Sequence, residues 1–190
     1  MNKKVIILKI KKTLMKNYRF NVMKLIKSFS VLFMCIVIMS CTSKQKPSPP
    51  FKIKDKIGSV DVEINYNSPR VRDRVIWDEL VPYNQVWRTG ANEATRIKIS
   101  KDILIYDSPV KKGEYSFFTI PNKESWIVIF NNVPNQWGTY DYDSSKDVLR
   151  LKVIPIKSNK FFENMTFLIN KNNISFNWEN LSFILDIKEL

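Results

Sequence analysis

The sequence of 190 residues contains no histidine and only two cysteines, Cys35 and Cys41. Without histidine, a Ser-His-Asp triad and an imidazole zinc site are excluded. Cys35 lies inside an apolar segment and Cys41 closes it, so the sequence after residue 41 has no thiol for a disulfide, a catalytic nucleophile or a metal site. Any catalysis would depend on carboxylate, Lys, Arg, Tyr, Ser or Thr side chains, and we expect no cofactor and no metal.

The chain is also short of apolar sequence for a membrane-spanning helix. Residues 29–39 form an apolar run of eleven residues, whereas a spanning helix needs about 20. This run follows the basic residues Lys24 and Lys27, and it precedes Ile38-Met39-Ser40-Cys41, which resembles the bacterial lipobox. We predict a lipoprotein signal peptide at residues 23–40 and a lipid anchor on Cys41. The alternative is an ordinary transmembrane anchor with a cysteine at its edge.

Acidic residues are missing from residues 1–41, which contain nine Lys and Arg. The formal net charge of +13 therefore belongs mainly to this segment, and the remaining chain, with 22 basic and 18 acidic residues, has a net charge of +4. A charge of that size does not indicate a nucleic-acid partner. We expect residues 1–22 to be an over-extended N-terminus, with translation starting at Met23. The alternative is that they form a genuine, extended n-region of the signal peptide.

Helical patterns are scarce, and the only expected helical turn is at residues 75–80. Residues 41–56 include a polar, proline-rich stretch and are predicted to be the lipid anchor and a flexible tether. Residues 57–190 alternate apolar and polar side chains and are expected to form one domain. About nine short strands predict an all-β fold, an antiparallel β-sandwich or barrel with little helix. The expected strands are residues 60–66, 97–99, 103–105, 115–120, 126–130, 148–154, 165–169, 174–178 and 181–187.

Three motifs stand out: SPRxxxR at residues 68–74, VWRTGANEAT at 86–95 and WGxYDY at 137–142. With GxYS at 113–116, they resemble domain-of-unknown-function family 2911, which is found in bacterial envelope proteins. The resemblance covers residues 58–187 and implies an all-β fold, with no established activity and no assigned catalytic residues. Two turn positions depart from the family pattern: Lys111-Lys112 replaces Pro-Ala, and Asn84 replaces a glycine. Asn84 tolerates a positive φ, so the fold should be unaffected.

The first two motifs supply the main ligand-binding candidates. Arginine side chains offer planar forks for a carboxylate, a phosphate or a sulfated sugar, and tryptophan offers a stacking wall. The candidates are Arg70, Arg74, Trp87, Arg88, Asn92 and Glu93. The alternative, which we favour, is that one or more of Arg70, Arg74 and Arg88 pairs internally with Glu93, Asp73 or Asp78 and fixes a loop to the sandwich.

The third motif supplies aromatic and acidic candidates. Trp137 and Tyr140, together with Tyr142, can form a platform that stacks on sugar rings, although such side chains more often pack in a core or at its rim. The acidic run of Asp141, Asp143 and Asp147 lacks the glycine and terminal glutamate of a calcium loop, so we interpret it as a solvated loop.

These observations favour a lipid-anchored binding module of the bacterial cell envelope, with a small anionic or carbohydrate ligand or a partner protein. The alternative is a hydrolase in which Glu93 works with Asp73, Asp78 or Asp141 as a second carboxylate. A purely structural role in assembly is the third hypothesis. Thr42 follows the lipidation site where inner-membrane retention would favour aspartate, so we expect outer-membrane attachment.

Overall fold

The computed structural model describes Met15 and residues 47–190. Cys41 and the predicted signal peptide therefore lie outside the described residues, and both remain predictions. Residues 47–190 contain ten β-strands and one short 3-10 helix, Ser144–Lys146, but no α-helix. No helix in this part of the chain combines the length and the apolar character that a membrane span requires.

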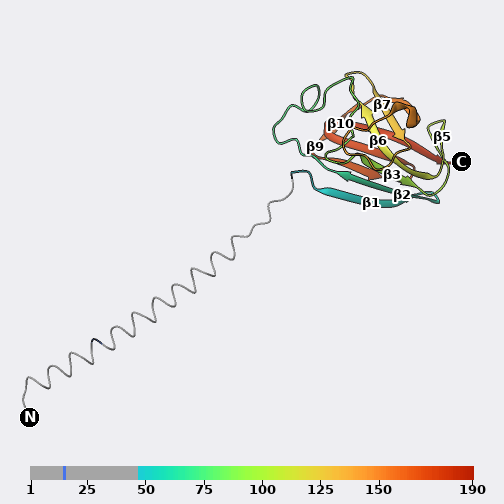
Figure 1. Ribbon diagram of the computed structural model, residues 1–190, viewed down its shortest axis with the longest axis horizontal. Helices are drawn as coiled ribbons and strands as arrows, with labels where there is room; N and C mark the ends of the chain where they lie inside the picture. The colour runs from blue at the N-terminus through green and yellow to red at the C-terminus, as the bar shows by residue number, and fades with distance from the viewer. Residues whose placement is uncertain (1–14, 16–46) are drawn as a thin grey trace, which may run out of the picture. The chain divides into compact units, whose positions relative to one another are not determined.

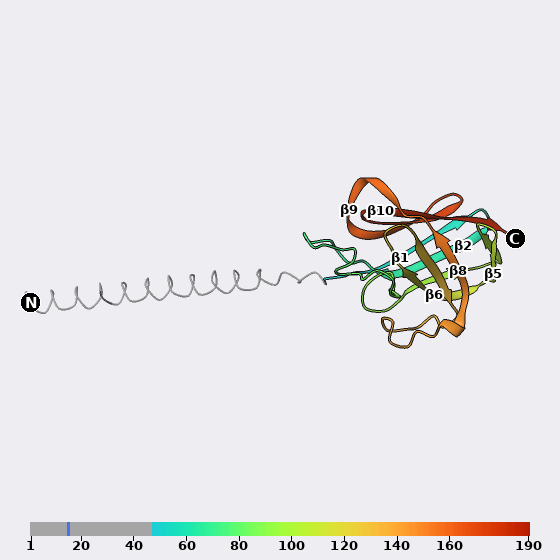
Figure 2. The same cartoon turned by 90° about the horizontal axis from the view of Figure 1, so that it is seen from above.

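The strands form two antiparallel sheets that pack as a sandwich, which confirms the all-β expectation (Figures 1 and 2). Figure 2 shows the layer that contains β9 and β10 above the layer that contains β1, β2, β6 and β8. The six-stranded sheet has the order β1 (Pro50–Ile57), β2 (Val60–Asn67), β3 (Thr95–Ile99), β6 (Gly113–Ile120), β7 (Trp126–Asn131) and β8 (Asp147–Val153). The four-stranded sheet has the order β5 (Ser108–Val110), β4 (Ile103–Ile105), β10 (Asn173–Glu189) and β9 (Ile156–Ile169).

The core lies between the sheets and follows from period-two alternation. In β2, the apolar side chains from Val60 to Tyr66 are buried, whereas the polar residues between them are only partly buried. Phe176 and Phe183 of β10 stack with ring centroids 4.9 Å apart, and Trp126 of β7 packs against both rings. Burial of such large side chains is the main stabilising contribution to a sandwich of this size.

Four tryptophans form a cluster at one end of this core. Trp77, Trp87, Trp126 and Trp178 pack with ring centroids 4.8 to 6.5 Å apart. Trp77 donates its indole N–H to Glu179 Oε2 at 2.7 Å, which joins the loop between β2 and β3 to the four-stranded sheet. The cluster thereby fixes the segment that carries the first two sequence motifs.

The predicted tether at residues 41–56 is wrong for residues 50–56, because β1 begins at Pro50. β1 pairs with β2 over eight residues, and Ser68 also donates its backbone N–H to Pro49 O at 3.0 Å. Lysines occupy alternate positions of β1 and disguise its period-two pattern, although Ile53 packs against the core. Such lysines are common on edge strands, where they oppose pairing with another chain.

The expected helical turn at residues 75–80 is also wrong. This segment forms turns, in which Val81 N–H donates to Ile76 O at 2.9 Å and Asp78 N–H donates to Val81 O at 3.0 Å. Asp78 has a φ of 70°, a left-handed conformation that a right-handed helix excludes. Trp77 is drawn into the tryptophan cluster, and this tertiary contact overrides the local helical pattern.

Other differences concern strand length. The two strands expected at residues 174–178 and 181–187 form one strand, β10, which is interrupted by bulges around Glu179. Glu179 has a φ of 54°, which bends the strand without ending it. β9 starts nine residues earlier than expected, and β5 was not expected because it contains Pro109, a residue confined to edge strands. Asn84 has a φ of 60°, as predicted.

Candidate functional site

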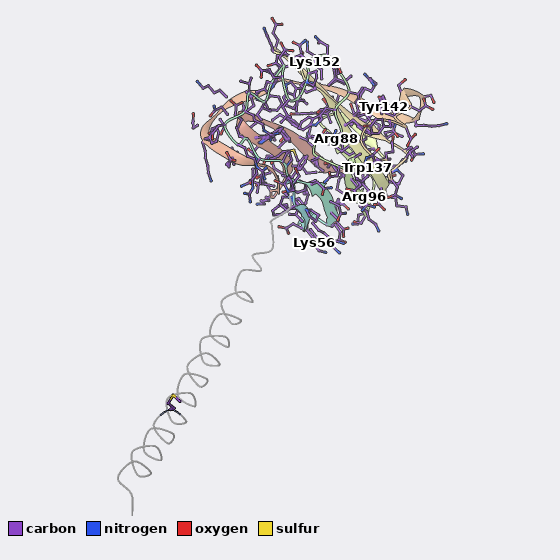
Figure 3. The ribbon with its side chains drawn as sticks, turned by 60° about the vertical axis from the view of Figure 1, so that its left-hand side comes forward. Lys56, Arg88, Arg96, Trp137, Tyr142 and Lys152 are labelled. Atoms are coloured by element: carbon purple, nitrogen blue, oxygen red, sulfur yellow. The ribbon has the colours of Figure 1, made fainter. Side chains whose placement is uncertain are left out.

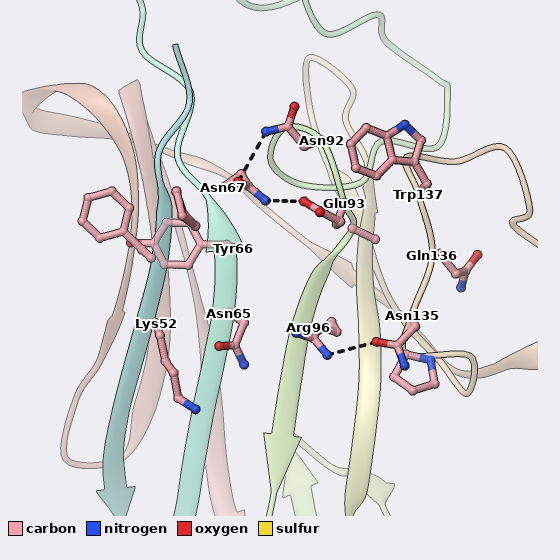
Figure 4. A pocket seen from close by; sticks show the side chains of 14 residues that line it. Lys52, Asn65, Tyr66, Asn67, Asn92, Glu93, Arg96, Asn135, Gln136 and Trp137 are labelled. Atoms are coloured by element: carbon pink, nitrogen blue, oxygen red, sulfur yellow. Dashed lines mark hydrogen bonds between the residues drawn. The ribbon is translucent and has the colours of Figure 1, made fainter. Parts of the chain in front are cut away.

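A groove of about 1010 Å³ crosses the outer face of the six-stranded sheet (Figure 4). Its floor consists of β1, β2 and β3, and its wall consists of the loop residues before β3 and those after β7. Four carboxamide residues that are not buried line it, Asn65, Asn67, Asn92 and Asn135, and so does the buried Gln136. The other lining residues are Pro50, Phe51, Lys52, Tyr66, Glu93, Ala94, Arg96, Pro134 and Trp137. We refer to this site as the amide groove.

The floor side chains face outward because their neighbours face the core. Lys52, Asn65 and Arg96 are aligned across β1, β2 and β3 in the strand register. Lys52 Nζ lies 2.8 Å from Glu63 Oε1, and this hydrogen bond, together with one from Asn65, lowers the pKa of Glu63. Arg96 Nη1 lies 3.1 Å from Glu114 Oε1 and donates to Asn135 Oδ1 at 3.0 Å. The charges of the floor are therefore already compensated.

One end of the groove is a network of polar side chains, drawn with dashed lines in Figure 4. Asn67 Nδ2 donates to Glu93 Oε2 at 2.9 Å, and Asn92 Nδ2 donates to Asn67 Oδ1 at 3.3 Å. Asn92 has a φ of 58°, a conformation that asparagine tolerates better than most residues. Asn67 thus orients both candidates of the second motif, Asn92 and Glu93, at the end of β2.

The second and third motifs meet at this end of the groove. Glu93 and Trp137 form an isolated antiparallel bridge, and Gly138 N–H donates to Asn92 O at 3.1 Å. Trp137 is 57% exposed to solvent. This value is unusual for tryptophan, which has the largest apolar side chain. Figure 4 shows its indole beside Glu93. Tyr140 is 85% exposed but does not line the groove.

A buried polar network behind the wall was not predicted. Gln136 Nε2 donates to Ser116 Oγ, Asn131 Oδ1 and Val133 O at 2.8 to 3.1 Å. Asn131 Nδ2 donates to Asp143 O and to Asp147 Oδ1 at 2.9 and 2.8 Å. This network ties the loop between β7 and β8 to the sheet and so positions the groove wall. Asn131 at the end of β7 and Gln136 in the loop that follows are isolated carboxamides, which gave no sequence signal for the network.

Beside the groove, a small apolar cluster covers the same outer face. Phe118 and Ile129 are fully buried there, and the Tyr142 ring packs edge-on against Phe118 at 5.0 Å. Burial and a 2.6 Å hydrogen bond from the Tyr142 hydroxyl to Asp147 raise the pKa of Tyr142 to about 12. Tyr142 is therefore a packing residue at the sheet surface and not part of a stacking platform.

A separate cavity of about 320 Å³ lies beside the tryptophan cluster. Two of the candidate arginines, Arg74 and Arg88, line it together with Trp87 and Trp178. Trp87 donates its indole N–H to Gly90 O at 3.1 Å. A Cβ atom at Gly90 would lie 3.1 Å from Asn67 O and 3.2 Å from Thr95 Oγ1, so the turn of the second motif is tight at that point. We refer to this site as the arginine cavity.

Two of the arginines, Arg74 and Arg88, do not form the internal ion pairs that the favoured alternative offered for one or more of them. Arg74 donates its Nε to Val71 O at 3.1 Å and its Nη2 to Arg70 O, so it binds its own turn. Arg88 (labelled in Figure 3) forms no ion pair with any residue of the described part, and burial lowers its pKa. Arg70 is half-buried and its backbone forms a bridge with Asn164; among the described residues it lines neither site.

The carboxylates that were candidate partners of Glu93 do not line the amide groove. Within residues 47–190, Glu93 is the only acidic residue that lines the amide groove, and Asp73, Asp78 and Asp141 line neither site. Asp143 caps the 3-10 helix by accepting the Ser145 N–H at 2.8 Å. The described residues contain no group of three or more acidic side chains that could hold a metal ion.

Comparison with known proteins identifies the family. The sequence model described as "Protein of unknown function (DUF2911)" matches residues 48–187, which span all three motifs and both sites. The chain belongs to this family. No curated protein and no solved structure matches it. The DUF2911 match begins within three residues of β1, in agreement with a folded part that starts before residue 57.

Proposed function

We propose that this DUF2911 protein binds a carbohydrate or a similar polyhydroxylated ligand in the amide groove. One observation carries the proposal: four carboxamides that reach the surface, one carboxylate and a largely exposed tryptophan line a single open groove. Carboxamides both donate and accept hydrogen bonds, as the hydroxyl groups of a sugar do. The exposed Trp137 supplies an apolar face for a sugar ring.

The charge distribution favours a neutral ligand over an anion. Lys52 and Arg96, the two cations of the groove, are paired with Glu63 and Glu114, which reduces the positive field that an anion would meet. Binding is also favoured over hydrolysis, because cleavage of a glycosidic bond by two carboxylates requires a partner about 5 to 9.5 Å from Glu93. Among the described residues, no second carboxylate lines the groove.

We also propose that Cys41 carries a lipid anchor and that the protein works in the bacterial cell envelope, at the outer membrane. The basic n-region, the apolar run and the serine before Cys41 support this assignment. The residues between Cys41 and β1 then form a tether that spans roughly 26 Å when fully extended.

Glycan-array screening followed by calorimetric titration tests the ligand proposal. We expect Trp137→Ala to weaken oligosaccharide binding by about tenfold, because ring stacking contributes roughly 1 kcal/mol or more. Tyr140→Ala is the matched control, since Tyr140 is an exposed aromatic residue of the same loop that does not line the groove. Equal losses in both variants, or no glycan bound by the wild type, would contradict the proposal.

Metabolic labelling with a fatty acid tests the anchor. We expect Cys41→Ala to abolish acyl labelling and to release the protein from the membrane fraction. Labelling that persists in this variant would contradict lipidation of Cys41, and it would leave the ligand proposal unaffected.

A further inference from the structure

One end of the amide groove places an exposed aromatic ring and an exposed carboxylate on the same face. Glu93 and Trp137 lie directly opposite each other in their bridge, which two backbone hydrogen bonds of 3.0 and 3.1 Å flank on either side. Opposed side chains in such a pair project to the same side, with Cβ atoms about 4.5 to 5.5 Å apart. The backbone register therefore fixes the indole beside the carboxylate, as Figure 4 shows.

Glu93 is the uncompensated charge of the groove. The two cations that line it, Lys52 and Arg96, have carboxylate partners of their own, Glu63 and Glu114. Glu93 forms no ion pair with any residue of the described part. Two cations and three carboxylates leave one negative charge, and it lies at the end of the groove that holds the exposed tryptophan.

Two asparagines hold the Glu93 carboxylate in place without a cation. Asn67 Nδ2 donates to Glu93 Oε2 at 2.9 Å, and Asn92 Nδ2 donates to Asn67 Oδ1 at 3.3 Å. A neutral amide donor orients a carboxylate but does not neutralise its charge. Because the carboxylate is already oriented, binding a ligand cation there requires little further ordering of the protein.

We infer that this end of the groove binds a protonated amino group of the ligand, so that the preferred ligand is an amino sugar. The inference rests on the proposed carbohydrate function and names its ligand class. The ammonium group donates to Glu93 and lies against Trp137, since a cation within about 6 Å of an indole ring is attracted by the π-system. The other exposed carboxamides of the groove bond the sugar hydroxyl groups.

Calorimetric titration of the full-length protein with three oligosaccharides of equal length and linkage tests this inference. The probes are oligomers of glucosamine, N-acetylglucosamine and glucose, which carry an amino, an acetamido or a hydroxyl group at the same carbon. At low ionic strength and a pH that keeps the amine protonated, we expect the glucosamine oligomer to bind about fivefold more tightly than the other two, as for an exposed ion pair. Added salt should reduce this preference.

Glu93→Gln removes the charge but keeps an oxygen acceptor for Asn67. We expect this variant to lose the preference for the glucosamine oligomer, and residual binding of the glucose oligomer would show that it is folded. Glu124→Gln is the matched control, since Glu124 is an exposed carboxylate that lines neither site, and it should keep the preference. The net charge of +4 after residue 41 gives no general attraction for cations.

The possible failures of the two proposals can be told apart. Equal binding of the three oligosaccharides by the wild type would overturn the amino-sugar inference and leave the carbohydrate site standing. A preference that survives Glu93→Gln, or that Glu124→Gln abolishes equally, would also overturn the inference alone. Binding of none of the three would overturn the inference together with the proposed function.

Discussion

The amide groove and the arginine cavity differ in how one arginine of each is bonded. In the groove, Asn67 bonds both Asn92 and Glu93, and Arg96 bonds both Glu114 and Asn135. In the cavity, the buried Nε of Arg88 has no acceptor among the described residues. A site whose groups satisfy one another is held in place without a ligand. A buried donor that stays unsatisfied lowers the stability of the fold.

The largest expected effect is a difference in unfolding free energy between two tryptophan variants. One tryptophan belongs to the cluster beside the cavity, and the other lies at the groove. Trp126 is fully buried in the tryptophan cluster, so Trp126→Ala should lower the free energy of unfolding by about 3 to 5 kcal/mol. Trp137 is exposed, so Trp137→Ala should change it by less than about 0.5 kcal/mol. Urea unfolding measures both. A large loss in Trp137→Ala would mean that this residue serves packing and not binding.

A smaller loss is expected from the polar network behind the groove wall. Asn131→Ala removes a buried carboxamide that bonds Asp143 O, Asp147 and Gln136, so we expect about 2 to 3 kcal/mol lower stability. Hydrogen exchange should become faster in the loop between β7 and β8. Glycan affinity should fall as well, because this network positions the groove wall; an unchanged affinity would contradict that role.

Arg88 should give an effect of the opposite sign. Because its buried Nε lacks an acceptor, Arg88→Met should raise the free energy of unfolding by about 1 kcal/mol in the absence of ligand. Arg96→Met, which removes a paired arginine of the groove floor, should leave stability unchanged or slightly lower. Urea denaturation of both variants gives the comparison, and destabilisation by Arg88→Met would contradict an unsatisfied site.

The smallest expected effect is a dependence on alkaline pH at the outer apolar cluster. The pKa of Tyr142 is raised to about 12, mainly by burial and by its bond to Asp147. Since the folded state favours the protonated hydroxyl, its stabilising contribution is complete below pH about 10 and is lost as the pH rises to about 12. Partial exposure limits the effect to roughly 1 kcal/mol. Tyr142→Phe should flatten stability curves measured between these pH values; an unchanged slope would contradict the assignment.

The fold could be predicted from the sequence wherever one face of a strand is buried. Val60 to Tyr66 in β2 alternate regularly, and the structure buries the alternate apolar residues as expected. β1 was missed because its lysines resemble a tether, and the helical turn at residues 75–80 was wrong because packing of Trp77 decided its conformation. The local sequence pattern predicts which face of a strand is buried, but it does not predict the tertiary contacts of a loop.

The residues of the candidate sites could be predicted from the sequence, but not which of them lie together in space. The first two motifs appeared to form one binding region, yet Asn92 and Glu93 line the groove, whereas Trp87 and Arg88 line the cavity. Neighbours in the chain point to different sites because the turn at Gly90 lies between them. The contributions of Lys52 and Asn65 to the groove depend on strand register, which no single segment specifies.

The position of Pro50 determines where the proposed tether joins the domain. Pro50 starts β1, pairs with Asn67 in the strand register and lines the amide groove. The groove therefore opens at the root of the tether and not at the distant end of the domain. If Cys41 carries the proposed anchor, the few residues between it and β1 would keep the start of the groove within roughly 26 Å of the attachment point. Its ligands would be those that come close to the membrane surface.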